Sequence, residues 1–386
     1  MKILWLCSWY PNKLKPFEGD FIQRHAKAVS LIHDVRVIFI KKDEFGVITK
    51  TSREDVTTNE NLTETIIYYN PVKTGIGPID KIISDYQYKK LYKQILKKYL
   101  EENEKPPIVH LHVAMKAGII ALWLKKKYNI PFVLSEHWTG YYKPALDNIY
   151  NRGLIFKYLT KQVLSNTTML LPVTKDLGET INQDIVKATY TVIPNAVNTD
   201  LFYYKPVQNK KIRFIHLSSM NYHKNIGGII RGVKLLADEG WDFELKMIGS
   251  VNGSFIELAG QLNLIGEFIE FKNEIPYEEV ANEMQLSNAL VLFSRVENLP
   301  CVILEALCCG LPVVASEVGG INEVINDQNG ILVESKNELQ LKEAMKKMIL
   351  NYSNYNRQEI AGDAKNKFSY TVVGKQFNEI YAGFIK

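Results

Sequence analysis

Two acidic residues, Glu297 and Glu305, stand eight residues apart in a segment suited to binding a polyhydroxyl ligand. The pattern predicts a strand that ends at Phe293, a short loop, and a helix that Pro300 can begin, because the first N–H of a helix needs no partner. With Glu297 in the loop and Glu305 on the helix, both carboxylates can line one pocket. Carboxylates accept hydrogen bonds from paired hydroxyls, and sugars and riboses supply such hydroxyls. The unpaired N–H groups at the helix start, before Ile303, would add a site for an anion.

Three further groups of residues follow predicted strands and could reach the same ligand. Lys224 and Asn225 stand between a strand and a helix, where a lysine is placed for a phosphate. Gly19 opens the first helix and would let a phosphate approach the backbone closely. His137 follows an inner strand and would face the same cleft. The plainer alternatives are a solvated lysine, a structural histidine and surface carboxylates.

Short apolar runs alternate with amphipathic stretches along the whole chain, which is typical of β-α-β units and parallel sheets. The predicted strands are Lys2–Trp9, Asp34–Ile40, Thr65–Tyr69, Ile108–Val113, Phe132–Glu136, Met169–Val173, Tyr190–Ile193, Ile212–Leu217, Glu244–Ile248, Ile269–Lys272, Ala289–Phe293, Pro312–Ala315 and Gly330–Val333. The predicted helices are Asp20–Ser30, Asp80–Glu102, Lys116–Tyr128, Arg152–Ser165, Lys175–Asn182, Ile226–Glu239, Ser254–Leu262, Tyr277–Ser287, Val302–Cys309 and Asn337–Leu350. We therefore expect an α/β protein with two doubly wound domains, whose ligands bind between them at the carboxyl ends of the strands.

The composition is that of a soluble globular protein. Of the 386 residues, 46% are hydrophobic and 23% are charged, and the net charge of +5 is too small to indicate a nucleic-acid partner. No secretory signal precedes the first strand and no apolar run is long enough to span a bilayer, so we expect a cytoplasmic protein, soluble or peripheral. The four cysteines lack the spacing of a zinc site or a disulfide framework.

The two halves of the chain differ in charge. Residues 1–190 hold 28 Lys and Arg against 19 Asp and Glu, whereas residues 191–386 hold 19 against 23. Between them lies a turn-forming segment, Pro194–Asn198, which we take as the domain boundary. The basic first half favours an anionic partner or contact with an anionic membrane at the inner face of the cell membrane. Within it, residues 80–105 predict one long Lys- and Tyr-rich helix, with either a solvated charged face or a membrane-surface face.

Together these features resemble family 4 of the retaining glycosyltransferases, which have the two-domain GT-B fold. The most specific match is the E-x7-E pattern of Glu297 and Glu305 with Gly319-Gly320 downstream. The supporting matches are Trp9-Tyr10-Pro11 with Gly19 and His25-Ala26, the Pro194–Asn198 turn with Phe202, the Lys224-Asn225 pair, and Phe368-Ser369-Tyr370 with Phe377 and Tyr381. The resemblance covers nearly the whole chain and implies three parts. Residues 1–194 would form an acceptor domain, residues 195–366 a donor domain, and residues 367–386 a helix that packs back on the first domain.

The resemblance also implies roles for individual residues toward a nucleotide-sugar donor. Glu297 would hold the hydroxyls of the sugar, Glu305 the ribose, and Lys224 the diphosphate. His137 would lie beside the reacting sugar, and Gly19 would close the site from the N-terminal side.

Backbone groups would complete the donor site. Those at Asn298, Leu299 and Cys301 would bind sugar and phosphate, and those near Ile275 would bind the base. Neither a metal nor a cofactor is implied, and no aspartates are spaced as Asp-x-Asp, the pattern of metal-dependent glycosyltransferases of the other main fold. The nucleotide sugar, linked to UDP or GDP, is a substrate.

One position departs from the family pattern. Many members carry an arginine five residues before the diphosphate lysine, where this chain has Ser219. Either the leaving diphosphate has one cationic partner from this loop, or Arg295, beside Glu297, supplies the second.

The sequence thus predicts a metal-independent, retaining hexosyltransferase that acts on a glycan or lipid-linked acceptor in surface polysaccharide or glycolipid synthesis. Two alternatives stay open. One is a GT-B nucleotide-sugar 2-epimerase, which needs no acceptor. The other is a nucleotide-binding protein with weak or no catalysis, which the missing arginine at Ser219 leaves open.

Overall fold

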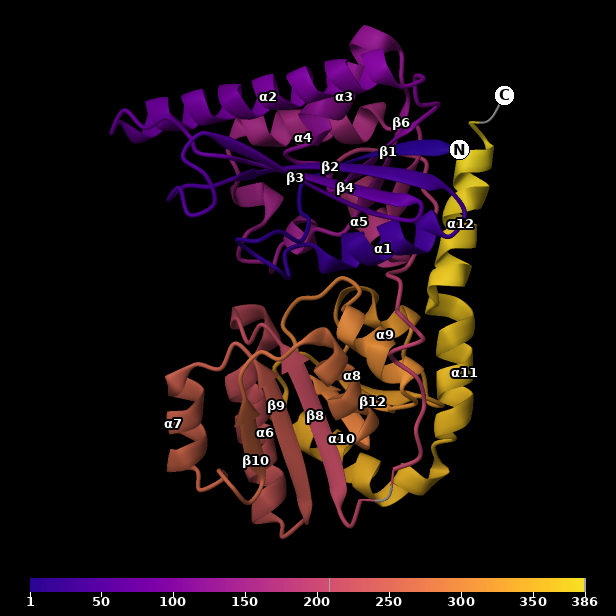
Figure 1. Cartoon of the computed structure of the whole chain (residues 1–386). Helices are drawn as coiled ribbons and strands as arrows, with labels where there is room; N and C mark the ends of the chain where they lie inside the picture. Colours follow the sequence, from indigo (N-terminus) through magenta and orange to yellow (C-terminus); the bar gives the residue numbers. More distant parts are fainter. Residues whose placement is uncertain (208, 385–386) are drawn as a thin grey trace.

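The computed structural model describes residues 1–207 and 209–384, which form two α/β units, each built on its own sheet (Figure 1). The first sheet has seven strands in the order β3-β4-β2-β1-β5-β6-β7. The strands are β1 (Lys2–Cys7), β2 (Asp34–Lys42), β3 (Ser52–Asn59), β4 (Leu62–Tyr69), β5 (Val109–His112), β6 (Phe132–Glu136) and β7 (Leu170–Pro172). Neighbouring strands are parallel except for β3, which runs antiparallel to β4 at the sheet edge.

The second sheet has six parallel strands in the order β10-β9-β8-β11-β12-β13. The strands are β8 (Ile212–Ser218), β9 (Phe243–Gly249), β10 (Ile269–Lys272), β11 (Ala289–Leu292), β12 (Val313–Ser316) and β13 (Gly330–Val333). The inner strands are continuous apolar runs, such as the fully buried Ala289–Leu292, because helices cover both faces of a parallel sheet.

The helices of the first unit are α1 (Asp20–Ser30), α2 (Gly77–Glu102), α3 (Gly118–Tyr128), α4 (Leu154–Asn166) and α5 (Lys175–Asp184). Those that follow are α6 (Ile226–Asp238), α7 (Gly253–Gln261), α8 (Tyr277–Gln285), α9 (Cys301–Cys308), α10 (Glu338–Asn351), α11 (Arg357–Phe368) and α12 (Tyr370–Ala382). The prediction of two doubly wound sheets is confirmed, with helix and strand ends shifted by a few residues.

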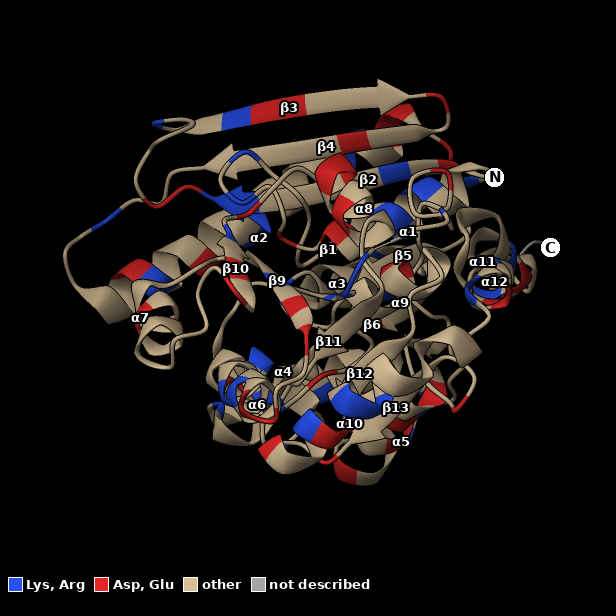
Figure 2. Ribbon diagram, turned by 90° about the horizontal axis from the view of Figure 1, so that it is seen from below, with Lys and Arg blue, Asp and Glu red and all other residues tan. Residues whose placement is uncertain are grey.

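One predicted strand is wrong, and two elements of the structure were not predicted. The segment Tyr190–Ile193 is not a strand, although it hydrogen-bonds beside β7 through the Thr191 and Ile193 amides. The following Pro194 cannot donate a hydrogen bond to extend such a ladder. Strand β3 and helix α11 were not predicted. β3 is almost wholly exposed and rich in charged residues (Figure 2), so it lacks the apolar alternation that marks a half-buried strand.

The chain passes between the two units twice, and the two crossing segments lie side by side. The first crossing follows Ile193, and the second lies between α11 and α12, where the Val197 amide donates to the Phe368 carbonyl (2.8 Å). Helix α12 then packs against α1 (Figure 1) so closely that a Cβ on Gly374 would lie 2.3 Å from the Ala28 carbonyl oxygen. The predicted return of the last helix to the first domain is therefore confirmed.

Candidate active site

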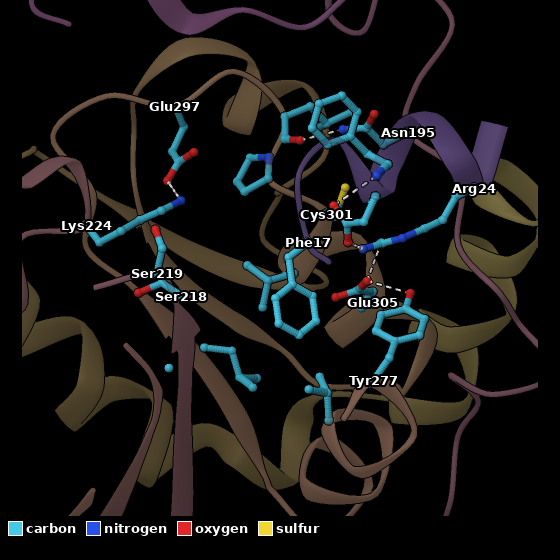
Figure 3. Close-up of a pocket in the computed structure, with 18 of the residues that line it drawn as sticks. Phe17, Arg24, Asn195, Ser218, Ser219, Lys224, Tyr277, Glu297, Cys301 and Glu305 are labelled. Carbon is cyan, nitrogen blue, oxygen red and sulfur yellow. Dashed lines mark hydrogen bonds and ion pairs between the residues drawn. The ribbon is translucent and has the colours of Figure 1, made fainter. Parts of the chain in front are cut away.

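A cavity of about 500 Å³ lies between the two sheets, lined by residues that follow strands of both (Figure 3). Nine of the thirteen predicted site residues line it: His137, Ser219, Lys224, Ile275, Glu297, Asn298, Leu299, Cys301 and Glu305. The other four, Gly19, Asn225, Arg295 and Ile303, do not. Parallel strands end at one edge of a sheet, which is why segments distant in the sequence meet here.

Glu297 is buried in the loop after β11 and is held by a cation and a hydroxyl. The Lys224 Nζ lies 2.5 Å from its Oε1, and the Ser294 hydroxyl donates to the same oxygen at 2.7 Å. The loop is fixed by Gly319, which has a φ of +55° and whose Cβ would lie 2.1 Å from the Glu297 carbonyl oxygen. Only glycine fits that position, so Gly319 fixes the backbone of the loop that carries the Glu297 carboxylate.

Glu305 lies on α9 and is paired with a residue of the other domain. Arg24, on α1, donates to its Oε1, and the Tyr277 hydroxyl donates to the same oxygen at 2.8 Å. Arg24 also pairs with Asp20, and its guanidinium lies 4.7 Å from the centre of the Tyr277 ring. Burial raises the pKa of Glu305, and the Arg24 charge opposes that rise. A buried ion pair thus joins the two domains across the cavity wall.

Arg24 is not among the site residues predicted from the sequence. Its four-residue spacing from Asp20 on an amphipathic helix is that of an ordinary surface pair. The Arg24 side chain is nevertheless only 9% exposed, because α1 faces the second domain.

The start of α9 is only partly available to a ligand. Cys301 and Val302 line the cavity, but Ile303 is fully buried in the core and its amide donates to the Pro300 carbonyl at 3.1 Å. The predicted anion site is therefore confined to the first two residues of the helix.

Gly19 and Asn225 support cavity residues without lining the cavity themselves. Gly19 precedes α1 with a φ of +69°, and a Cβ there would lie 2.9 Å from the Trp9 backbone. Asn225, with a φ of +52°, joins the turn that carries Lys224 to α6. Both residues adopt the left-handed conformation that glycine and asparagine tolerate best.

Arg295 does not line the cavity. Its guanidinium lies 4.6 Å from the centre of the Tyr222 ring and donates to the Tyr222 carbonyl (3.1 Å), outside the cavity. Among the residues that line the cavity, the two cations are Lys224 and Arg24.

His137 belongs to a cluster of three buried histidines with His25 and His112. Each offers a ring nitrogen within 4.8 Å of the others, and both nitrogens of His112 and of His137 lack hydrogen-bond partners. Burial lowers the pKa of each, that of His25 to about 4, so all three are neutral at pH 7. Neutral imidazoles could ligate a transition-metal ion or hydrogen-bond to sugar hydroxyls and ordered water.

Three hydrogen bonds hold the 298–299 loop against the first domain and the crossing segment that follows it. The Thr174 hydroxyl donates to Asn298 Oδ1 (2.8 Å), the Asn298 amide donates to the His137 carbonyl (3.3 Å), and the Asn195 amide donates to the Leu299 carbonyl (2.8 Å). The loop that carries the site is thus shared between both domains.

Among the described residues, no helix is both long and apolar enough to cross a bilayer.

Comparison with known proteins gives two family matches that together span most of the chain. Residues 33–201 match the model described as Glycosyltransferase Family 4, and residues 201–366 match Glycosyl transferases group 1. An uncharacterized glycosyltransferase of Methanocaldococcus jannaschii is 29% identical over 81% of this chain and 82% of its own length. The putative teichuronic acid biosynthesis glycosyltransferase TuaC of Bacillus subtilis is 22% identical over 89% and 88%. The crystal structure of Anabaena HepE, in complex with UDP and glucose, superposes with a TM-score of 0.73 at 14% identity over 99% of each chain.

Proposed function

The chain is a glycosyltransferase of the group 1 and family 4 type, and from that premise we propose that it transfers a hexose from a nucleotide-diphosphate sugar with retention of anomeric configuration. The observation that carries the proposal is the placement of Glu297 and Glu305, each paired with a cation, around one cavity between two parallel sheets. The HepE structure, which has the same fold, holds UDP and glucose.

Binding of the donor requires the ion pairs of the cavity to exchange partners. The charged residues that line the cavity are two cations, Arg24 and Lys224, and four carboxylates, Asp20, Glu274, Glu297 and Glu305. A diphosphate adds negative charge, so it needs cations that are not neutralised. If hydroxyls of the sugar hydrogen-bond to Glu297 and hydroxyls of the ribose hydrogen-bond to Glu305, Lys224 and Arg24 lose their carboxylate partners and can pair with the diphosphate instead.

The proposed transfer follows from this arrangement. The bond between the anomeric carbon and the diphosphate oxygen breaks, and the acceptor oxygen bonds to the same face of the sugar. The acceptor proton passes to the leaving phosphate. Charge builds on that phosphate, and Lys224 with the first amides of α9 stabilises it, as preorganised donors do at an oxyanion. His137, neutral at pH 7, would hydrogen-bond to the sugar.

We propose that the reaction needs no metal ion, because the two cations and the helix start already offer positive charge to the leaving group. Activity should then persist in EDTA. Loss of activity in EDTA with recovery on adding Zn²⁺ or Co²⁺ would contradict this and would direct attention to His25, His112 and His137.

The acceptor is proposed to be a glycan or a lipid-linked saccharide of a surface polysaccharide or glycolipid. The similarity to TuaC, named for teichuronic acid biosynthesis, supports a polymeric or lipid-linked product. The enzyme would work in the cytoplasm, at the inner face of the membrane where such acceptors are assembled.

A panel of UDP- and GDP-sugars, followed for release of nucleoside diphosphate with and without saccharide acceptors, tests the proposal. Acceptor-dependent release with a retained anomeric configuration in the product, read by NMR, supports it. Isomerised sugar without acceptor would identify an epimerase, and binding without turnover a nucleotide-binding protein. Release from no donor would refute the transferase reaction.

A further inference from the structure

Three histidines that are distant in the sequence meet beside the cavity, and we call them the histidine cluster. His25 lies on α1, His112 ends β5 and His137 follows β6. Each offers a ring nitrogen within 4.8 Å of those of the other two. The sheet explains the meeting, because β5 lies between β1, which leads into α1, and β6. Parallel strands end at one edge, so the three segments converge there.

Most ring nitrogens of the histidine cluster lack a partner. Of the six, five are buried without a hydrogen bond to any part of the chain that the structure describes, and the sixth is the His25 Nε2. The neighbouring His110 shows the ordinary arrangement, since its two nitrogens hydrogen-bond to the Tyr381 and Ser135 hydroxyls at 2.5 and 2.8 Å. A buried polar atom without a partner is costly, so five of them in one place indicate a binding site.

The surroundings of the histidine cluster suit metal-binding imidazoles. The His25 Nε2 lies 3.0 Å from the Pro194 carbonyl oxygen, so Nε2 carries the proton and Nδ1 presents its lone pair. The Asn195 side chain faces His137, and its buried Oδ1 has no other partner among the described residues. A metal-bound histidine almost always donates its second N–H to a nearby oxygen, which fixes the orientation of the ring.

The donor atoms select the kind of ion. Imidazole nitrogens bind Zn²⁺ and Co²⁺, whereas Mg²⁺ and Ca²⁺ prefer oxygen ligands. Burial lowers the pKa of all three histidines, that of His25 to about 4, so they are neutral at pH 7, the form that ligates metals. Zn–N bonds of about 2.0–2.1 Å place tetrahedral nitrogens about 3.3 Å apart. Rotation of the side chains would therefore have to bring the rings together by at most about 1.5 Å.

We propose that the histidine cluster binds one Zn²⁺ ion and that the bound ion inhibits the enzyme. His137 lines the cavity, whereas His25 and His112 are fully buried and do not. The fourth position of the ion would then open toward the cavity, as in three-histidine zinc sites. The inhibition rests on the proposed function, because a His137 that ligates the ion cannot hydrogen-bond to the sugar of the donor. The ion is a reversible inhibitor and takes no part in the transfer.

Binding of Co²⁺ to the whole protein, first treated with EDTA, tests the site without any nucleotide sugar. We expect one Co²⁺ per chain, with the intense visible absorption of four-coordinate Co²⁺, and displacement of that ion by Zn²⁺. Zn²⁺ should also raise the melting temperature, because a ligand of the folded state stabilises it. No binding, or the weak absorption of six-coordinate Co²⁺, would overturn the site.

Two variants each remove one ligand with little change in packing. H112F keeps an aromatic ring against Trp5, whose ring centre lies 4.0 Å from that of His112. It also loses no hydrogen bond, because both His112 nitrogens lack partners, so in EDTA it should melt no lower than the unaltered protein. H25Q retains an amide that can donate to the Pro194 carbonyl. Each variant should lower the affinity for Co²⁺ at least about 100-fold, since loss of an outer partner alone costs 10–100-fold.

H223Q is the matched control, because His223 is partly exposed and the other six histidines of the chain are buried. An adventitious ion would bind at His223, so H223Q should bind Co²⁺ as the unaltered protein does. Loss of binding in H223Q, or full binding in both cluster variants, would refute the assignment.

The inhibition has its own measurement. Zn²⁺ should slow sugar transfer by the unaltered enzyme and have much less effect on H112F, and equal inhibition of both would refute inhibition through the cluster. Co²⁺ binding needs no donor. Its failure leaves the proposed transferase reaction intact, and absence of transfer leaves the binding test intact.

Discussion

Replacing Arg24 by methionine should destabilise the protein at neutral pH, and the loss should equal the cost of burying the Glu305 carboxylate without its cation. The Arg24 and Glu305 side chains are 9% and 6% exposed, so among the described residues the substitution leaves the buried carboxylate with the Tyr277 hydroxyl as its hydrogen-bond partner. Breaking a buried pair in this way costs about 3–5 kcal/mol. An independent argument agrees, since keeping a carboxyl of ordinary pKa, about 4.3, protonated at pH 7 costs about 1.36 kcal/mol per pH unit, or roughly 3–4 kcal/mol.

The loss should depend on pH in a defined direction. Burial already raises the pKa of Glu305, and removing Arg24 takes away the charge that opposes this rise. A carboxyl with a higher pKa in the folded than in the unfolded protein favours folding most when it is protonated. The deficit of the variant should therefore shrink as pH falls toward 5, by roughly 1.4 kcal/mol per pH unit. Urea unfolding of unaltered protein and variant from pH 5 to 8 measures it.

Two further variants make this prediction refutable. R24M/E305Q should recover most of the lost free energy of unfolding and show little pH dependence, because neither position 24 nor position 305 then carries a charge. Arg213, which pairs with Glu244 at 30% and 32% exposure, is the matched control: R213M should cost less than about 1 kcal/mol. A pH-independent loss in R24M, or no recovery in the double variant, would refute the account of a buried charge.

The remaining predictions concern turnover and packing. K224A should lower turnover at least about 100-fold, the effect of losing one oxyanion donor of about 2.7 kcal/mol, while R295A should leave donor affinity and turnover unchanged. G319A should destabilise the protein by more than about 1 kcal/mol, because the added Cβ would clash with the Glu297 carbonyl oxygen. Thermal melting measures the loss of stability, and the Michaelis constant for the donor measures the displacement of Glu297. G374V should release α12 from α1, where no Cβ fits, and lower the melting temperature; an unchanged melting temperature in either glycine variant would contradict the packing described.

The sequence predicted the parts of the fold that depend on hydropathy patterns. The apolar runs of the inner strands and the loop-to-helix segment around Glu297 were both found, because alternation, glycine and proline are local signals. The charged edge strand β3 was missed since it buries almost nothing. Arg24 was missed, and Arg295 was one of two alternatives considered, because which cation lines a cavity depends on how two domains meet. Nearness to Glu297 in sequence indicated Arg295, whereas packing placed Arg24 beside Glu305.

The course of α12 makes the second domain an insertion within the first. The chain starts in β1, leaves the first domain after Ile193, and returns to it with α12, where His33 hydrogen-bonds to Asn378 (2.9 Å). Strand β1 and helix α12 accordingly lie at the same domain (Figure 1). An inserted unit with its two junctions side by side can be exchanged without disturbing either terminus of its host. The Val197–Phe368 hydrogen bond thus marks the junction at which the second domain of a related protein could be transplanted into this chain.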